Sequence, residues 1–190
     1  MKTKTKIRHP LFRAFLALIP FLSVLFVVPV PAFAVEVGDT VGCVKLKEVF
    51  NPQRETRGPT SCMEAQEERN QFTLLEFFTV ECGYCHQNLP IFARLSEEIR
   101  GTTSSRLVSL TRDLSSVNGY IQRNHQEMVN PVLLDERLEA QRGYQIKYVP
   151  TIFLIDQNKK VIFKKIGVLS DQDLEEIRRL VKGGEGLELE

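Results

Sequence analysis

The sequence predicts a protein of the α/β class, because strand-like and helix-like segments alternate along it. The run 72–79 is largely apolar and aromatic, with Glu76 as its only charge, which is typical of a buried parallel strand. A helix is expected directly after it, at 83–100. Two β-prone runs, 151–156 and 160–166, flank a short polar turn and indicate a hairpin. Alternation of this kind identifies the α/β class.

Further elements follow from hydrophobic periodicity and from residues that begin or end helices. They are a strand at 106–110, a helix from Ser115 or Ser116 towards Glu127, a short strand at 132–134 and a helix at 136–144. Ser170, with Asp173 three residues later, has the spacing of a capping box and predicts a last helix to about Lys182.

The chain is long enough for one globular domain with short appendages, since it has 190 residues, 43% of them hydrophobic and 26% charged. We expect a signal peptide at 1–34, an irregular extension with short strands at 35–70, the main domain at 71–182 and a flexible acidic tail at 183–190. The extension, with a β-prone run at 41–49, is expected to cover one edge of the sheet. With 25 basic and 24 acidic side chains, the net charge of +1 gives no indication of a nucleic-acid partner.

The N-terminal segment has the three parts of a secretory signal. A cationic leader precedes the largely apolar stretch 14–28, and Ala32 and Ala34 supply small residues before a cleavage site after Ala34. The alternative is a retained membrane anchor, because 14–34 is uncharged and about long enough to span a bilayer. Pro29 and Pro31 favour cleavage, since proline breaks a helix. We therefore expect an exported, periplasmic protein, membrane-anchored if the signal is retained.

Four cysteines are expected to meet an oxidising compartment, where thiols pair or take part in redox chemistry. Cys82 and Cys85, two residues apart, form the natural unit, which leaves Cys43 with Cys62 as a structural disulfide. Cys82 follows a strand and begins a helix, where unpaired amide groups and the helix dipole favour a thiolate. Cys82 is therefore the expected attacking sulfur, and Cys85, one turn further on, is placed to resolve the mixed disulfide.

Three motifs together resemble the thioredoxin superfamily. They are the run Leu75–Cys85, Pro90 in the following helix, and the segment Lys147–Thr151. The long separation of Cys82 from Pro150 and the stretches 131–135 and 149–156 are similar to the exported TlpA-like group. This resemblance implies a three-layer fold with a central mixed sheet flanked by helices and a strand–helix insertion before the cis-proline segment.

The resemblance also implies roles for single residues. Pro150 matches the cis-proline beside the active-site disulfide, and Val149 matches the position whose backbone pairs with an extended client. Glu76 matches a buried acid whose raised pKa suits a proton relay to Cys85. Gly83 and Tyr84 lie between the cysteines, so they are candidate client contacts, although Tyr84 has the alternative of being only an exposed aromatic.

The implied function is a thiol–disulfide oxidoreductase that acts on protein cysteines, with a redox-active disulfide and no other cofactor. Many TlpA-like proteins reduce disulfides with electrons passed across a membrane, so a reducing direction and a membrane electron-transfer partner are expected. Gly83-Tyr84 places no imidazole between the sulfurs, which agrees with that direction. Glu81 replaces the family's usual tryptophan, and a DsbA-like disulfide oxidant remains the alternative.

Other readings of the cysteines remain open. Cys82-x-x-Cys85-His86 also fits the attachment string of a c-type haem, with Met128 or Met63 as the axial partner of His86. A zinc site with all four cysteines lacks a second short ligand spacing. The Cys82–Cys85 pair is also interpretable as a purely structural disulfide. Glu76 has the alternative of a strand residue whose carboxylate reaches solvent. His86 is interpretable either as a surface residue or as a catalytic base.

Overall fold

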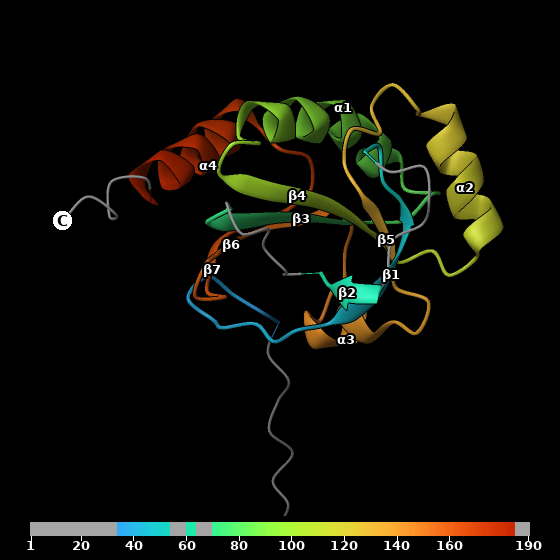
Figure 1. Cartoon of the computed structure of the whole chain (residues 1–190), viewed down its shortest axis with the longest axis horizontal. Helices are drawn as coiled ribbons and strands as arrows, with labels where there is room; N and C mark the ends of the chain where they lie inside the picture. Colours follow the sequence, from blue (N-terminus) through green and yellow to red (C-terminus); the bar gives the residue numbers. More distant parts are fainter. Residues whose placement is uncertain (1–33, 54–59, 64–69, 185–190) are drawn as a thin grey trace, which may run out of the picture. The chain divides into compact units, whose positions relative to one another are not determined.

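Strand β3 (Phe72–Phe78) lies inside a mixed sheet whose strand order is β2-β1-β5-β4-β3-β6-β7 (Figure 1). The computed structural model describes residues 34–53, 60–63 and 70–184. The other strands are β1 (Lys45–Phe50), β2 (Thr60–Cys62), β4 (Thr103–Ser109), β5 (Val132–Leu134), β6 (Thr151–Asp156) and β7 (Val161–Ile166). The helices are α1 (Gly83–Glu98), α2 (Leu114–Arg123), α3 (Glu139–Gly143) and α4 (Asp171–Gly184).

The connections explain why the sheet is mixed. Strands β3, β4 and β5 run parallel, because α1 and α2 return the chain to the same end of the sheet before each new strand. Strand β6 pairs antiparallel with β3, and the hairpin to β7 continues that edge. Strand β5 and helix α3 precede the cis-proline segment, as expected, so the predicted fold class is confirmed.

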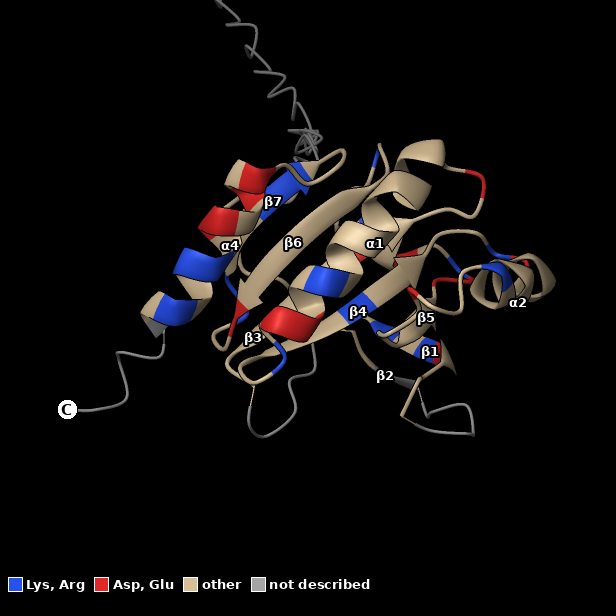
Figure 2. Ribbon diagram, turned by 90° about the horizontal axis from the view of Figure 1, so that it is seen from above, with Lys and Arg blue, Asp and Glu red and all other residues tan. Residues whose placement is uncertain are grey.

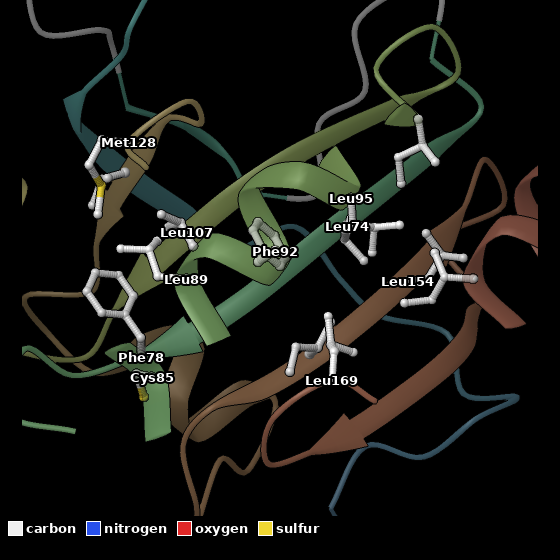
Figure 3. Packing of buried hydrophobic residues seen from close by; sticks show 14 of the residues in the cluster. Leu74, Phe78, Cys85, Leu89, Phe92, Leu95, Leu107, Met128, Leu154 and Leu169 are labelled. Atoms are coloured by element: carbon white, nitrogen blue, oxygen red, sulfur yellow. The ribbon is translucent and has the colours of Figure 1, made fainter. Parts of the chain in front are cut away.

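One face of the sheet is covered by α1, α2 and α4, as Figure 1 shows. Alternate side chains of β3 point to this face, where Leu74 and Phe78 belong to one core cluster with Phe92 of α1 and Leu154 of β6 (Figure 3). Each of these side chains is at most 2% exposed. Burying a leucine or phenylalanine contributes about 1.5–3 kcal/mol, so this face anchors α1 firmly on the sheet.

The opposite face is covered by α3 and the segment that follows it. Phe77 of β3, Phe153 of β6 and Tyr144 form a three-ring cluster with centroid separations of 5.2–5.9 Å. Because both faces are covered, all seven residues of β3 are buried. This explains the nearly continuous apolar run by which the strand was predicted.

The N-terminal extension extends the sheet instead of only covering its edge. Strand β1 pairs antiparallel with β5, and β2 pairs with β1 to form the outer edge. A disulfide joins Cys43 to Cys62, and Arg106 Nη1 of β4 donates hydrogen bonds of 3.0 and 2.8 Å to the carbonyls of Cys62 and Met63. The extension is therefore tied to the sheet through side chains as well as through strand pairing.

Several boundaries differ from the sequence predictions. Strand β4 begins at Thr103, because the three polar residues before Arg106 pair with the first three residues of β3. Asp113 caps α2 by accepting from Ser116 N at 2.7 Å, so neither predicted serine is the cap.

Two further helix boundaries also differ. Helix α3 is shorter than predicted, because residues 136–138 precede it and Asp135 accepts from the backbone amides of Glu139 and Gln141 at its start. Helix α4 runs two residues beyond Lys182.

The predicted leader at 1–33 and the tail from 185 onward lie outside the described residues. Among the residues that the structure does describe, no helix is long and apolar enough to cross a membrane.

We predict that the Cys43–Cys62 bridge is structural. It spans 19 positions, for which chain entropy gives about 3 kcal/mol of stabilisation, so the Cys43→Ser/Cys62→Ser double variant should lose about that much free energy of unfolding in a urea titration. The Cys82→Ser/Cys85→Ser double variant is the matched control. An unchanged unfolding free energy for the first variant would contradict a structural role.

Candidate active site

Cys82 and Cys85 form a disulfide at the start of α1. Cys82 is the N-cap of the helix, and its Sγ accepts a hydrogen bond from the Cys85 amide at 3.1 Å. Cys85 is 1% exposed, whereas Cys82 is only half-buried. A reactant that approaches from solvent therefore meets the sulfur of Cys82 first.

The electrostatics of this helix end favour a negative sulfur. The first turn carries no acidic residue, and Figure 2 shows the charged residues of α1 towards its far end. The unpaired amide groups of a helix N-terminus carry a partial positive charge, which lowers the pKa of a cysteine placed there. With Cys82 as N-cap, this partial charge acts directly on its sulfur.

The segment before β6 lies against the disulfide. Cys82 Sγ is 3.5 Å from the carbonyl oxygen of Val149, and the Val149–Pro150 peptide is cis. Pro150 accepts a hydrogen bond of 2.8 Å from the amide of Gly167, which has a φ of 98° that side-chain-bearing residues rarely adopt. The segment is thus hydrogen-bonded to the residue that follows β7, and it faces the sulfur of Cys82.

Exposed apolar side chains gather around this segment. Tyr84 and Tyr148 are each 66% exposed and Ile166 is 51% exposed. Ile166 pairs with Thr151 in the β6–β7 ladder, next to Pro150. Exposed apolar patches of this kind often mark interaction surfaces.

Glu76 is buried in the middle of β3, with 1% of its surface exposed. Burial raises its pKa to about 8, against which a 3.0 Å hydrogen bond from Asn88 Nδ2 to Oε2 acts in the opposite direction. The carboxylate does not reach solvent, so that alternative is wrong. A buried acid with a pKa near neutrality has the property of a proton relay.

Asn88 is a site residue that the sequence analysis missed. It is fully buried on α1, one turn after Cys85, and it joins Glu76 to the backbone amide of Leu169. The signal was present, because Cys85, Leu89 and Phe92 are on the same helix face, and position 88 falls on that face too. A polar residue on an apolar face is expected to have a specific partner.

The family model described as Redoxin matches residues 36–180, most of the chain. The chain belongs to the Redoxin family. Its match includes β3, Cys82, Cys85 and the Val149–Pro150 segment.

Individual relatives agree with this assignment. Sporulation thiol-disulfide oxidoreductase A of Bacillus subtilis is 29% identical over 113 residues, which cover 57% of this chain and 67% of that protein. The structure of StoA from Bacillus subtilis has a TM-score of 0.57 at 23% identity, covering 71% of this chain and 95% of that one. A structure described as a thiol:disulfide interchange protein DsbE from Chlorobium tepidum has a TM-score of 0.64 at 21% identity, covering 80% and 100%.

The solved structures support the fold, and the family match also supports the enzyme class. The predicted thioredoxin-like, TlpA-like relationship is confirmed, and so is the enzyme class, a thiol–disulfide oxidoreductase. Redoxin proteins of this type use a redox-active disulfide without a further cofactor. Within the described ranges, no group of three or more His, Cys, Asp and Glu side chains is arranged to hold a metal ion.

Helix α2 places one more titratable group beside the site. Tyr120 is 1% exposed, and both its burial and the charge of Glu76 raise its pKa. Its ring lies 5.0 Å from that of His86, whose Nε2 is 3.1 Å from the carbonyl of Val80. The His86 ring is thus engaged by Val80 and Tyr120.

We predict that Glu76 makes stability fall as pH rises. Because its pKa is about 8 in the folded state and near 4.5 in the unfolded state, the folded protein keeps the Glu76 proton to higher pH than the unfolded chain does. Its contribution is therefore complete below about pH 4.5 and is lost as pH rises through about 8. Glu76→Gln should remove this decline, and urea titrations at several pH values would measure it.

The exposed acid Glu81 gives the matched control for that measurement, as Glu81→Gln leaves the buried carboxyl in place. A constant difference in unfolding free energy between wild type and Glu76→Gln at every pH would show that Glu76 does not titrate as stated.

Proposed function

We propose that the chain is an exported thiol–disulfide oxidoreductase that reduces disulfides of client proteins through Cys82 and Cys85. The observation that carries this proposal is the position of Cys82. It is the N-cap of α1, half-exposed, and next to the carbonyl of Val149, while Cys85 is buried behind it. One sulfur is thus accessible for attack, and the other is reserved for resolution.

The proposed reaction has two displacement steps. In the reduced protein the Cys82 thiolate attacks a client disulfide, which forms a mixed disulfide and releases one client thiolate. Cys85 then loses its proton and attacks Cys82 Sγ, which releases the second client thiolate and forms the Cys82–Cys85 bond. Two electrons pass from the dithiol to the client, and the client thiolates take protons from water.

Glu76 is the proposed proton acceptor for Cys85. Its carboxyl lies on the α1 face of the sheet and accepts a hydrogen bond from Asn88, which is one helical turn after Cys85. A base works best when its pKa lies near the operating pH, and burial raises the pKa of Glu76 to about 8. A small carboxylate fraction is then present at neutral pH for the resolving step.

The proposed client-binding surface surrounds Cys82. Gly83 and Tyr84 lie on one side, and Val149 lies on the other, beside the exposed ring of Tyr148. The Val149 amide donates no backbone hydrogen bond within the described part of the chain, so it is available to an extended client segment. Tyrosines supply contact area at low conformational cost, and thus suit varied clients.

The reducing direction is supported by the surroundings of the sulfurs. Gly83-Tyr84 places no imidazole between them, and the His86 ring is engaged by the Val80 carbonyl and by Tyr120. The negative charge of Glu81, exposed just before Cys82, disfavours an additional negative charge nearby. Glu76 adds to this effect only where it is ionised, above about pH 8. A membrane protein that passes electrons to the oxidised pair is the partner that this direction requires.

Export remains part of the proposal, on the basis of the signal-like sequence before Val35. The protein is periplasmic after cleavage, or anchored if the segment is retained. The disulfide itself is the redox group, with no additional cofactor.

The haem alternative is not favoured by the positions of its proposed ligands. Met128 is 2% exposed and Met63 fully buried, and they belong to the cores on opposite faces of the sheet. Each is packed among apolar side chains, and the Nε2 of His86 faces the Val80 carbonyl. The arrangement supports disulfide exchange better than haem ligation.

We predict that Cys85→Ser traps clients as mixed disulfides on Cys82, because the attacking sulfur remains and the resolving one is lost. Non-reducing electrophoresis followed by peptide mapping would show the adducts. Cys82→Ser should trap few clients, since Cys85 is buried. Equal trapping by the two variants would contradict the assignment of roles.

We predict a reduction potential nearer the thioredoxin value of about −270 mV than the DsbA value of about −120 mV. The reason is that, among the residues that the structure describes, the Cys82 sulfur receives its hydrogen bond from the backbone amide of Cys85 and none from a side chain. Equilibration with glutathione buffers, read by thiol alkylation, measures it. A midpoint above about −150 mV would make the protein an oxidant of exported proteins instead.

A further inference from the structure

Asn88 connects three parts of the fold at a place with no exposure to water. Its side chain is fully buried on the inner face of α1. Nδ2 donates to Glu76 Oε2 of β3 at 3.0 Å, and Oδ1 accepts from the amide of Leu169, just before α4, at 2.9 Å. The mechanism proposed above gives this residue no role.

The orientation of the Asn88 amide is fixed by Leu169. A backbone N–H can only donate, so the group that faces it has to be the amide oxygen. The amide nitrogen is then turned towards Glu76, where it can only donate. Reversing the amide would place two donors opposite each other at Leu169 and lose both hydrogen bonds.

A donor held at Oε2 has a consequence for the proton of Glu76. Oε2 accepts from Asn88 whether the carboxyl is ionised or neutral, so a proton on Oε2 would compete with that hydrogen bond. The neutral acid therefore carries its proton on Oε1. Asn88 thus distinguishes two oxygens that are chemically equivalent in a free carboxyl group.

We propose that Asn88 is a positioning residue for the resolving step: it occupies Oε2 of Glu76 and leaves Oε1 as the atom that takes the proton from Cys85. This rests on the proposed function, in which Glu76 accepts that proton. The thiol proton of Cys85 moves to Oε1, the Cys85 thiolate attacks Cys82 Sγ, and the client sulfur leaves with the electron pair of the broken bond. Oε1 later returns the proton to solvent or to the next Cys85 thiolate.

The surroundings of Glu76 make this hydrogen bond important. Tyr120 and Cys85 are the buried titratable groups that the structure describes on α2 and α1, and the residues that pair with Glu76 on the neighbouring strands are Leu107 and Ile152. No cation among them stabilises the carboxylate. Asn88 supplies a hydrogen bond to the ionised form, and without it the acid titrates at higher pH.

The test is the pH profile of the resolving step. Reduced protein is mixed with dithiobis-nitrobenzoate in a stopped-flow instrument, and the first release of thionitrobenzoate reports attack by Cys82 and the second reports resolution by Cys85. Asn88→Leu should move the midpoint of the second phase to higher pH by about one unit, which means about tenfold slower resolution at pH 7. The first phase should be unchanged.

Asn88→Asp is the second variant, because it keeps an acceptor for the Leu169 amide and nearly the same volume. A second carboxyl beside Glu76 raises the pH at which the pair of acids loses its last proton. The midpoint of the second phase is therefore expected to move to higher pH, as in Asn88→Leu. The matched control is Asn130→Leu, since Asn130 is also buried but donates to Ser96. It should leave the midpoint where it is in the wild type.

Glu76→Gln separates the two possible failures. Loss of the pH dependence in Glu76→Gln, combined with unshifted midpoints in both Asn88 variants, would overturn the role of Asn88 and leave the relay intact. An unchanged second phase in Glu76→Gln would overturn the relay itself and the positioning role with it. Shifted midpoints in both Asn88 variants, with Asn130→Leu unshifted, support the proposal.

Discussion

The complete burial of β3 is the constraint on which the rest of the structure depends. Helices cover both faces of the sheet, so every side chain of this strand lies in a core, and a short segment, 79–82, connects its end to the first turn of α1. The packing of Phe92 and Leu89 on the strand fixes the position of that turn. The accessible sulfur of Cys82 is thus presented by a rigid junction between a strand and a helix.

The same burial makes one polar residue in β3 chemically unusual. A carboxyl in this position is costly to ionise, and within the described part of the chain the group that donates to it is the Asn88 amide and not a cation. A cation would have lowered the pKa of Glu76 well below neutrality, and an apolar neighbour would have left it still higher. The amide of Asn88 therefore keeps the acid near the pH at which a thiol and a carboxylate exchange a proton readily.

The elements with strong periodicity were predictable, and those set by tertiary contacts were not. The apolar run of β3, the helix after Cys82 and the hairpin of β6 and β7 followed from local pattern, whereas the buried position of Glu76 was implied by the family resemblance. Strand β4 begins earlier than its apolar residues suggest, because pairing with β3 orders the polar residues before Arg106. Asn88 was missed because its partners, Glu76 and Leu169, are distant in the sequence and meet only in the folded chain.

The hydrogen bond from Leu169 to Asn88 also determines which parts of the fold have to be transferred together if the proposed site is built into another protein. The sulfurs, the acid and the amide come from β3 and the start of α1, but the amide is oriented by Leu169, which is 81 positions away and just before α4. A graft of the short Cys82–Cys85 segment onto a foreign scaffold would carry the proposed nucleophile without the oriented acid. The unit proposed for thiol exchange is therefore the assembly of β3, α1 and the segment before α4, and it is transferable only as a whole.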